Sequence, residues 1–262
     1  MTLSENQLFQ GIFATLENRH WYRSYSPQSF YPVAGTLVPW FAGAALFFCA
    51  LGLWLAFFIV PVDAQQGEAS RIVFVHVPAA WMSMLIYLLL ASCASVGLVF
   101  NARLPAMMAH ALAPTGAMFA FLALWTGCLW AKPIWGAWWV WDLRVISQLV
   151  LLSVYLGFIA LQVTLDDPPL ADKASALIVL LGTIDIPINY FSTHWLTTLH
   201  QDASLRLSGT PGMALSMLAA IVAMTLGFWM YSCTVALLRL RCVILERERQ
   251  SDWATTREGV SS

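Results

Sequence analysis

Residues 37–60 are LVPWFAGAALFFCALGLWLAFFIV, a long apolar stretch without a charged side chain. A helix needs about 20 such residues to cross the roughly 30 Å hydrocarbon core of a bilayer. In hydrocarbon the backbone must satisfy its own hydrogen bonds, which favours a helix. The stretch therefore predicts a transmembrane helix, and the rest of the chain repeats the pattern.

The whole chain is apolar, with 60% hydrophobic and only 10% charged residues, against roughly 25% charged in soluble domains. The predicted transmembrane helices cover residues 37–60, 76–100, 108–130, 144–165, 174–193 and 213–238. We expect one all-α integral membrane domain spanning 1–262, with short cytoplasmic tails at both ends. The net charge of -1 gives no basic surface for nucleic acid, so membrane lipid is the expected surrounding.

The orientation follows from the distribution of Lys and Arg, which are enriched in cytoplasmic loops. Six helices place both termini on one side. That side carries Arg19, Arg23, Arg103, Lys173, Arg239, Arg241, Arg247, Arg249 and Arg257, whereas the other carries Arg71, Lys132, Arg144 and Arg206. Both termini are therefore predicted to be cytoplasmic, and the longer connectors near 61–75, 131–143 and 194–212 to share the periplasmic face.

The five cysteines form no CxxC pair, and the chain has no CxxCH motif for covalent haem attachment. They are interpreted as small buried apolar residues. The sequence contains no nucleophile–base pair and no nucleotide-binding loop, so we expect a protein that is not an enzyme.

The second predicted connector carries an unusual concentration of tryptophan, WGAWWVWDLR at 135–144. At helical pitch Trp135, Trp138, Trp139 and Asp142 would share one face. One interpretation is an interfacial belt that anchors helices at the headgroups. The other is an aromatic platform for a large planar ligand that comprises Trp135, Gly136, Trp138, Trp139, Trp141 and Asp142. Arg144 would pair with a ligand carboxylate or, alternatively, with Asp142.

Two histidines flank this stretch on the predicted periplasmic side. His76 lies where the second helix begins, and His200 lies in the last connector. A lone histidine at a membrane edge is usually an interfacial residue, but two neutral imidazoles can fill both axial positions of haem. His194 is a competing candidate, whereas His20 and His110 are predicted to lie on the cytoplasmic side.

Asp185 falls inside the fifth apolar run, where an unpaired acid is costly and a functional role is the default hypothesis. The alternative, which we favour slightly, is that Pro187 loosens the helix end and lets water reach the carboxylate.

Three motifs resemble those of the CcmC family of haem-handling cytochrome c maturation proteins. They are HVPAAW at 76–81, the tryptophan-rich "WWD" stretch at 135–144, and TLHQ at 198–201. DAQQG at 63–67 is also similar, and the resemblance covers about 30 to 245 in matching order.

The resemblance implies a multi-pass protein of the bacterial inner membrane with six helices. It implies periplasmic haem b, held without covalent attachment by two axial histidines, which map to His76 and His200, over the loop at 135–142. It also implies delivery of haem to the chaperone CcmE, in the company of CcmD and the ATP-binding cassette subunits CcmA and CcmB. Two rival hypotheses are a permease-type subunit of a haem-exporting ABC transporter and a b-type cytochrome redox subunit. A structural scaffold with interfacial tryptophans is a third.

Overall fold

The computed structural model describes residues 26–195, 214–251 and 253–255, with only the backbone described at 193–195. The described residues are helical and contain no β-strand. In chain order the elements are α3 (Pro27–Trp54), the π-helical turn η1 (Leu55–Ile59), the 3-10 turn η2 (Glu68–Ile72), α4 (Val73–Phe100), α5 (Arg103–Trp135), α6 (Leu143–Thr164), α7 (Pro168–Gly182), α8 (Asp185–Trp195) and α9 (Leu215–Arg247). Six helical spans are long and apolar enough to cross a membrane, which confirms the predicted fold class.

Most helices extend beyond the apolar stretches from which they were predicted. Helix α3 begins at Pro27, where the Ser26 hydroxyl accepts a hydrogen bond from the Ser29 backbone N–H at 3.3 Å and caps the helix. The last helix continues through its arginines to Arg247. The fifth predicted helix is interrupted, since α7 ends at Gly182 and α8 begins at Asp185.

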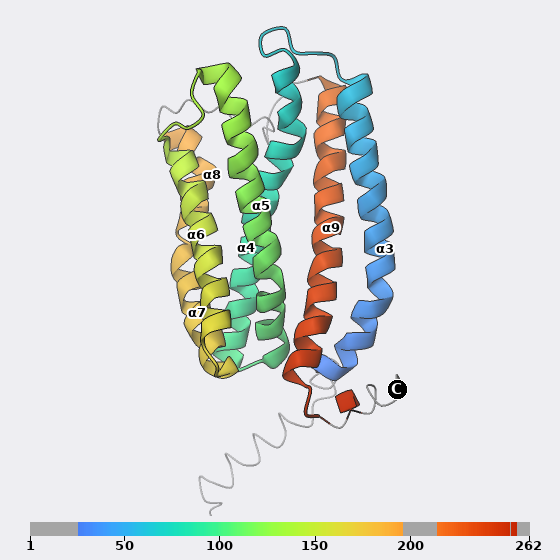
Figure 1. The fold of residues 1–262 in the computed structure, drawn as a ribbon, viewed down its shortest axis with the longest axis vertical. Helices are drawn as coiled ribbons and strands as arrows, with labels where there is room; N and C mark the ends of the chain where they lie inside the picture. Colours follow the sequence, from blue (N-terminus) through green and yellow to red (C-terminus); the bar gives the residue numbers. More distant parts are fainter. Residues whose placement is uncertain (1–25, 196–213, 252, 256–262) are drawn as a thin grey trace, which may run out of the picture.

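The helices form a bundle in which α4 and α5 pack against each other and both contact α9. Figure 1 shows α3 beside α9 on one side of the bundle and α6, α7 and α8 on the other. The largest cluster of buried apolar side chains lies between α4, α5, α6 and α7.

Glycine permits the close approach of α3 and α9. A Cβ on Gly227 would lie 2.5 Å from the Cys49 Sγ and 2.8 Å from the Cys49 backbone nitrogen. A Cβ on Gly52 would lie 2.9 Å from the backbone nitrogen of Met224. Small residues at such contacts let helices pack in lipid, where the hydrophobic effect does not drive their association.

A buried polar network links α4, α6 and α8 inside the bundle. The side-chain amide of Gln148 donates to the Ser83 hydroxyl at 3.0 Å, and that of Asn189 donates to the Gln148 carbonyl oxygen at 3.1 Å. The Tyr155 hydroxyl donates to the Ser83 backbone carbonyl at 2.8 Å. Because these groups satisfy one another, they stabilise helix packing at positions where a lone polar group would be costly.

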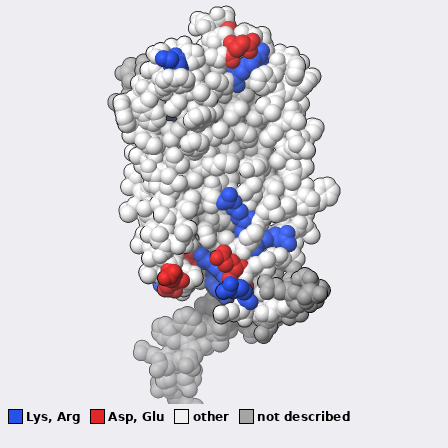
Figure 2. All heavy atoms as spheres, in the orientation of Figure 1, with Lys and Arg blue, Asp and Glu red and all other residues white. Residues whose placement is uncertain are grey.

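Charged side chains gather at the two ends of the bundle. Figure 2 shows a broad uncharged band between two charged zones, as expected for a chain surrounded by hydrocarbon. We call the end with segments 60–67 and 136–142 the loop end, and the end with Pro27 and Arg247 the opposite end (Figure 1). The described connectors at the opposite end are short, covering 101–102 and 165–167.

Candidate functional site

His76 lies near the start of α4 at the loop end, and its half-buried imidazole faces α5. Its Nδ1 lies 3.1 Å from the Thr126 hydroxyl oxygen. Thr126 is itself buried, and its hydroxyl lies 2.6 Å from the backbone carbonyl oxygen of Leu122. The imidazole is therefore held by a side chain fifty positions along the chain.

Trp130, one turn after Thr126 on α5, holds the same imidazole from another direction. The two rings meet edge to face, with centroids 5.7 Å apart and an interplanar angle of 66°. The Trp130 indole N–H donates to the Gln66 side-chain oxygen at 3.1 Å. The connector between the first two spans is thereby attached to the site that contains His76.

The tryptophan-rich stretch is a loop and not a continuation of the helix. α5 ends at Trp135, and Gly136 takes a left-handed conformation with φ 76° as its C-cap. This conformation suits glycine and ends the helix. Lys132 donates from its Nζ to the Gly136 carbonyl at 3.0 Å, and the ammonium lies over the Trp138 ring. The expectation that Trp135, Trp138, Trp139 and Asp142 share a helical face is therefore wrong, because the helix has ended before Trp138.

The loop tryptophans differ in exposure. Trp138 is 57% exposed and Trp141 75% exposed, whereas Trp139 is half-buried and packs edge to face with Trp141 at 5.4 Å between centroids. The Trp139 indole N–H is buried and has no acceptor among the described residues. A buried donor without an acceptor is rare in proteins and indicates that another group supplies one. Asp142 occupies the N-cap position of α6.

Arg144 lies in the first turn of α6, at the same end of the bundle, and its side chain is half-buried. Among the described residues its guanidinium makes no hydrogen bond and no direct ion pair, although Asp142 lies close enough to act on it electrostatically. A half-buried guanidinium whose hydrogen-bond donors have no acceptor among the described residues favours a bound anion.

Arg71, by contrast, is already engaged. Its guanidinium donates to the backbone carbonyl oxygens of Ala56 and of Val60, the latter at 3.4 Å, and it pairs with Glu68. These contacts satisfy carbonyl groups at the end of the first span. Arg144 is therefore the better candidate of the two for a ligand carboxylate.

Asp185, at the start of α8, is buried, and the Ser147 hydroxyl donates to its Oδ1 at 2.7 Å. The hypothesis that water reaches this carboxylate is therefore wrong. Its contact joins α8 to α6, the helix that carries Arg144. Tyr190 is exposed on α8, and the backbone of His194 continues the same helix.

Several candidates fall elsewhere. His200, Arg206 and His20 lie outside the described residues, so the pairing of His200 with His76 stays a prediction. His110 lies on α5 toward the opposite end, away from His76.

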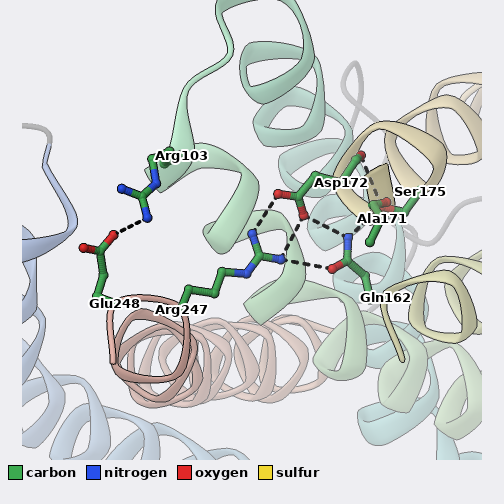
Figure 3. A network of polar contacts seen from close by, with 7 residues as sticks. All are labelled: Arg103, Gln162, Ala171, Asp172, Ser175, Arg247 and Glu248. Carbon is green, nitrogen blue, oxygen red and sulfur yellow. Dashed lines mark hydrogen bonds and ion pairs between the residues drawn. The ribbon is translucent and has the colours of Figure 1, made fainter. Parts of the chain in front are cut away.

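A cavity of about 270 Å³ lies at the opposite end, but the two arginines that line it, Arg103 and Arg247, are already engaged in ion pairs. Arg247 of α9 forms two hydrogen bonds to Asp172 of α7, at 2.7 and 2.9 Å, and a third to Gln162 of α6 at 3.1 Å (Figure 3). Arg103 pairs with Glu248 beside it. This network ties three helices together, and we therefore assign the functional site to the loop end.

Thr126 and Trp130 were not identified from the sequence alone, and Gln66 was noted only as part of the DAQQG stretch at 63–67. Thr126 and Trp130 lie four positions apart and hence on one helical face, which is a signal present in the sequence. That signal acquires meaning only when α4 is known to pack against this face.

Comparison with known proteins gives one consistent result. A family model described as "CcmC: Heme exporter protein C" matches residues 20–255. The chain is 40% identical to Heme exporter protein C of Escherichia coli strain K12 over 87% of its own length and 92% of that protein. It is also 40% identical to the protein of the same name from Bradyrhizobium diazoefficiens, over 86% of each chain. Identity to the Haemophilus influenzae protein of that name is 36%, over 89% of this chain and 95% of that protein.

Proposed function

The chain belongs to the CcmC, or heme exporter protein C, family, and from this premise we propose that it binds haem at its loop end and delivers it to the chaperone CcmE for cytochrome c maturation. In this proposal the protein lies in the bacterial inner membrane with both termini in the cytoplasm. The loop end then faces the periplasm, in agreement with the excess of Lys and Arg on the other side.

The observation that carries the proposal is the set of unsatisfied groups at the loop end. Among the described residues, the Trp139 indole N–H is a buried donor without an acceptor, and the half-buried Arg144 guanidinium donates no hydrogen bond. Two hydrogen-bond donors, one of them cationic, fit a carboxylate better than any neutral or cationic ligand. Haem carries two propionates, so the donor set fits this group.

The other contacts required by haem are an apolar surface and iron ligands. Trp138, Trp139 and Trp141 supply aromatic surface at one rim of the bundle, where the amphipathic indole is favoured. His76 provides one imidazole ligand, and the family resemblance assigns the second to His200. Non-covalent bis-imidazole ligation fits the absence of a CxxCH motif.

Haem itself supplies the reactive edge to which the chaperone forms its covalent bond. The residues of this chain bind and orient it, and no catalytic residue is assigned, so we propose that the protein is not an enzyme. CcmD, CcmA and CcmB are its proposed partners in the membrane.

A permease function would require a polar route through the helices. The buried polar side chains Gln148, Asn189 and Ser83 instead satisfy one another, and Gln162 joins the network with Asp172 at the opposite end. This arrangement favours haem binding at one face over haem passage through this chain.

The test is the haem content of the full-length protein purified in detergent, measured by the pyridine haemochrome spectrum. We expect His76→Ala and His200→Ala each to lose most bound haem. His110→Ala, a histidine variant at the opposite end, should keep it. Unchanged haem in both of the first two variants would refute the ligand assignment.

A further inference from the structure

The Thr126 hydroxyl oxygen lies within hydrogen-bond distance of several polar atoms, but the hydroxyl has only one proton to donate. Its oxygen lies 2.6 Å from the Leu122 backbone carbonyl oxygen and 3.2 Å from that of Ala123, and both are acceptors that can only receive a proton. The same oxygen lies 3.1 Å from Nδ1 of His76. Because a hydroxyl has one proton, and the helix carbonyls take it, Thr126 must accept a hydrogen bond from the imidazole.

We propose that Thr126 is a positioning residue that holds His76 in the Nδ1–H tautomer, so that the lone pair of the neutral ring lies on Nε2. Nε2 is then the atom that binds iron. The tautomer is inferred from the hydrogen bonds of the Thr126 hydroxyl, whereas the role in iron binding rests on the proposed function.

The alternative tautomer would place a proton on Nε2, where a metal ligand needs its lone pair. Free imidazole side chains in water favour that alternative, so the protein must reverse the preference. The neighbours of the ring oppose a simple rotation. Trp130 packs edge to face against the ring, and a reversed ring would lose the contact of Nδ1 with the Thr126 hydroxyl. The ring therefore keeps its Nδ1 toward Thr126.

The same hydrogen bond has an electronic consequence. An acceptor on Nδ1–H raises the basicity of the other ring nitrogen, and partners of this kind typically change metal affinity 10- to 100-fold. A more basic imidazole favours ferric over ferrous iron. Loss of the acceptor should therefore weaken haem binding and raise the midpoint potential of the bound iron.

The experiment compares Thr126→Val, which keeps the shape but removes the acceptor, with Thr126→Ser, which keeps the hydroxyl. Thr234→Val is the matched control, because the Thr234 hydroxyl is also bonded to a helix carbonyl, that of Met230 at 2.8 Å, and lies on α9. Three readouts are taken on the full-length protein in detergent. They are the ¹⁵N shifts of the His76 ring in haem-free protein, affinity for added haemin, and the midpoint potential of bound haem.

We expect an Nδ1–H ring in the wild type, Thr126→Ser and Thr234→Val, and loss of that tautomer in Thr126→Val. Thr126→Val should also bind haemin about 10-fold more weakly, with a raised midpoint potential. An Nε2–H ring in the wild-type protein, or an unchanged tautomer in Thr126→Val, overturns the inference without touching the proposed function. Haem binding that does not depend on His76 overturns the proposed function, while the haem-free tautomer still tests the role of Thr126.

Discussion

Trp130 and His76 meet edge to face, with their ring centroids 5.7 Å apart, although they lie on different helices. The indole is fixed in turn by its hydrogen bond to Gln66, which belongs to the connector before α4. Three segments therefore determine the position of one imidazole: the connector, α4 and α5. Changes in any of them should be detectable at the iron that His76 is proposed to bind.

Gly127 is the first such position, since its missing side chain leaves room for the His76 ring. In Gly127→Ala the new Cβ would lie 3.2 Å from the His76 Cε1, closer than ordinary van der Waals contact. The ring must move by a few tenths of an ångström away from its position beside Thr126. We expect a shifted Soret band and a haem affinity lower by about fivefold, equivalent to about 1 kcal/mol of overpacking.

The control is Gly97→Ala, whose Cβ would also meet a neighbour at 3.2 Å, the Cβ of Ala106 between α4 and α5. This variant crowds the same two helices, α4 and α5, near the opposite end of the bundle. If both variants lower haem affinity equally, the effect is general helix repacking and not displacement of His76.

The connector that holds Gln66 is ordered by Asp63. Its carboxylate accepts hydrogen bonds from the backbone N–H groups of Gln66 and Gln65, both at 2.8 Å, which lower the pKa of this exposed acid. Because the folded pKa lies below the unfolded value of about 3.9, the ionised form stabilises the turn at higher pH. That stabilisation is fully present above the unfolded pKa and is lost as the pH falls through the folded pKa.

We therefore expect the amides of Gln65 and Gln66 to be protected from hydrogen exchange at pH 6 and to lose protection as the pH falls below the unfolded pKa of about 3.9. Asp63→Ala should remove the protection at both pH values, whereas Asp63→Asn, which keeps an acceptor oxygen, should retain part of it. Equal protection in the wild type and in Asp63→Ala would contradict the role of this side chain.

Replacing Arg144 should lower haem affinity without lowering the thermal stability of the haem-free protein. Arg144→Met removes a half-buried cation that makes no direct ion pair or hydrogen bond to a described residue, so the thermal stability of haem-free protein should not fall. The same change removes a charge-assisted contact to a propionate, worth about 1.5–3 kcal/mol, so haem affinity should fall by about 10-fold or more. Arg144→Lys keeps the charge but not the planar fork and should be intermediate.

Arg239→Met, an exposed arginine toward the opposite end, is the control for loss of one positive charge. It should change neither the haem affinity nor the midpoint of thermal unfolding. A loss of stability in haem-free Arg144→Met would mean that the guanidinium supports the fold, and the assignment to a propionate would fail.

The spans could be predicted from the sequence because hydropathy depends on local composition alone. For the interruption between α7 and α8, Pro187 indicated only a loosened helix end, and contacts with another helix contribute at its exact position. The Tyr87 hydroxyl donates to the Val179 carbonyl at 2.7 Å, and a Cβ on Gly182 would collide with that hydroxyl. Nothing in the stretch 174–193 reveals that a tyrosine of α4 occupies this space.

In the candidate site, too, features set by the local sequence were predictable, whereas features set by contacts between helices were not. The motifs identified His76 and the loop tryptophans as residues of interest, since their types and clustering are visible in the sequence. The end of α5 at Gly136 was not predicted. A glycine in the left-handed conformation ends the helix there, whereas the neighbouring tryptophans are compatible with a longer helix. The contact between His76 and Thr126 was not predictable, because it depends on the register of α4 against α5.

The pairing of α3 with α9 gives the sharpest test of the fold itself. A Cβ in Gly227→Ala would lie 2.5 Å from Cys49 Sγ and 2.8 Å from the Cys49 backbone nitrogen, so the two helices must separate. We expect a destabilisation of about 1–3 kcal/mol, seen as a lower midpoint of thermal unfolding in detergent. Adding Cys49→Ala should rescue only part of this loss, because the backbone clash remains. Gly43→Ala lies on α3, the helix of Cys49, and should be neutral because nothing lies within 4 Å of its added Cβ. Full rescue by Cys49→Ala would show that the thiol, and not the approach of the two backbones, limits this contact.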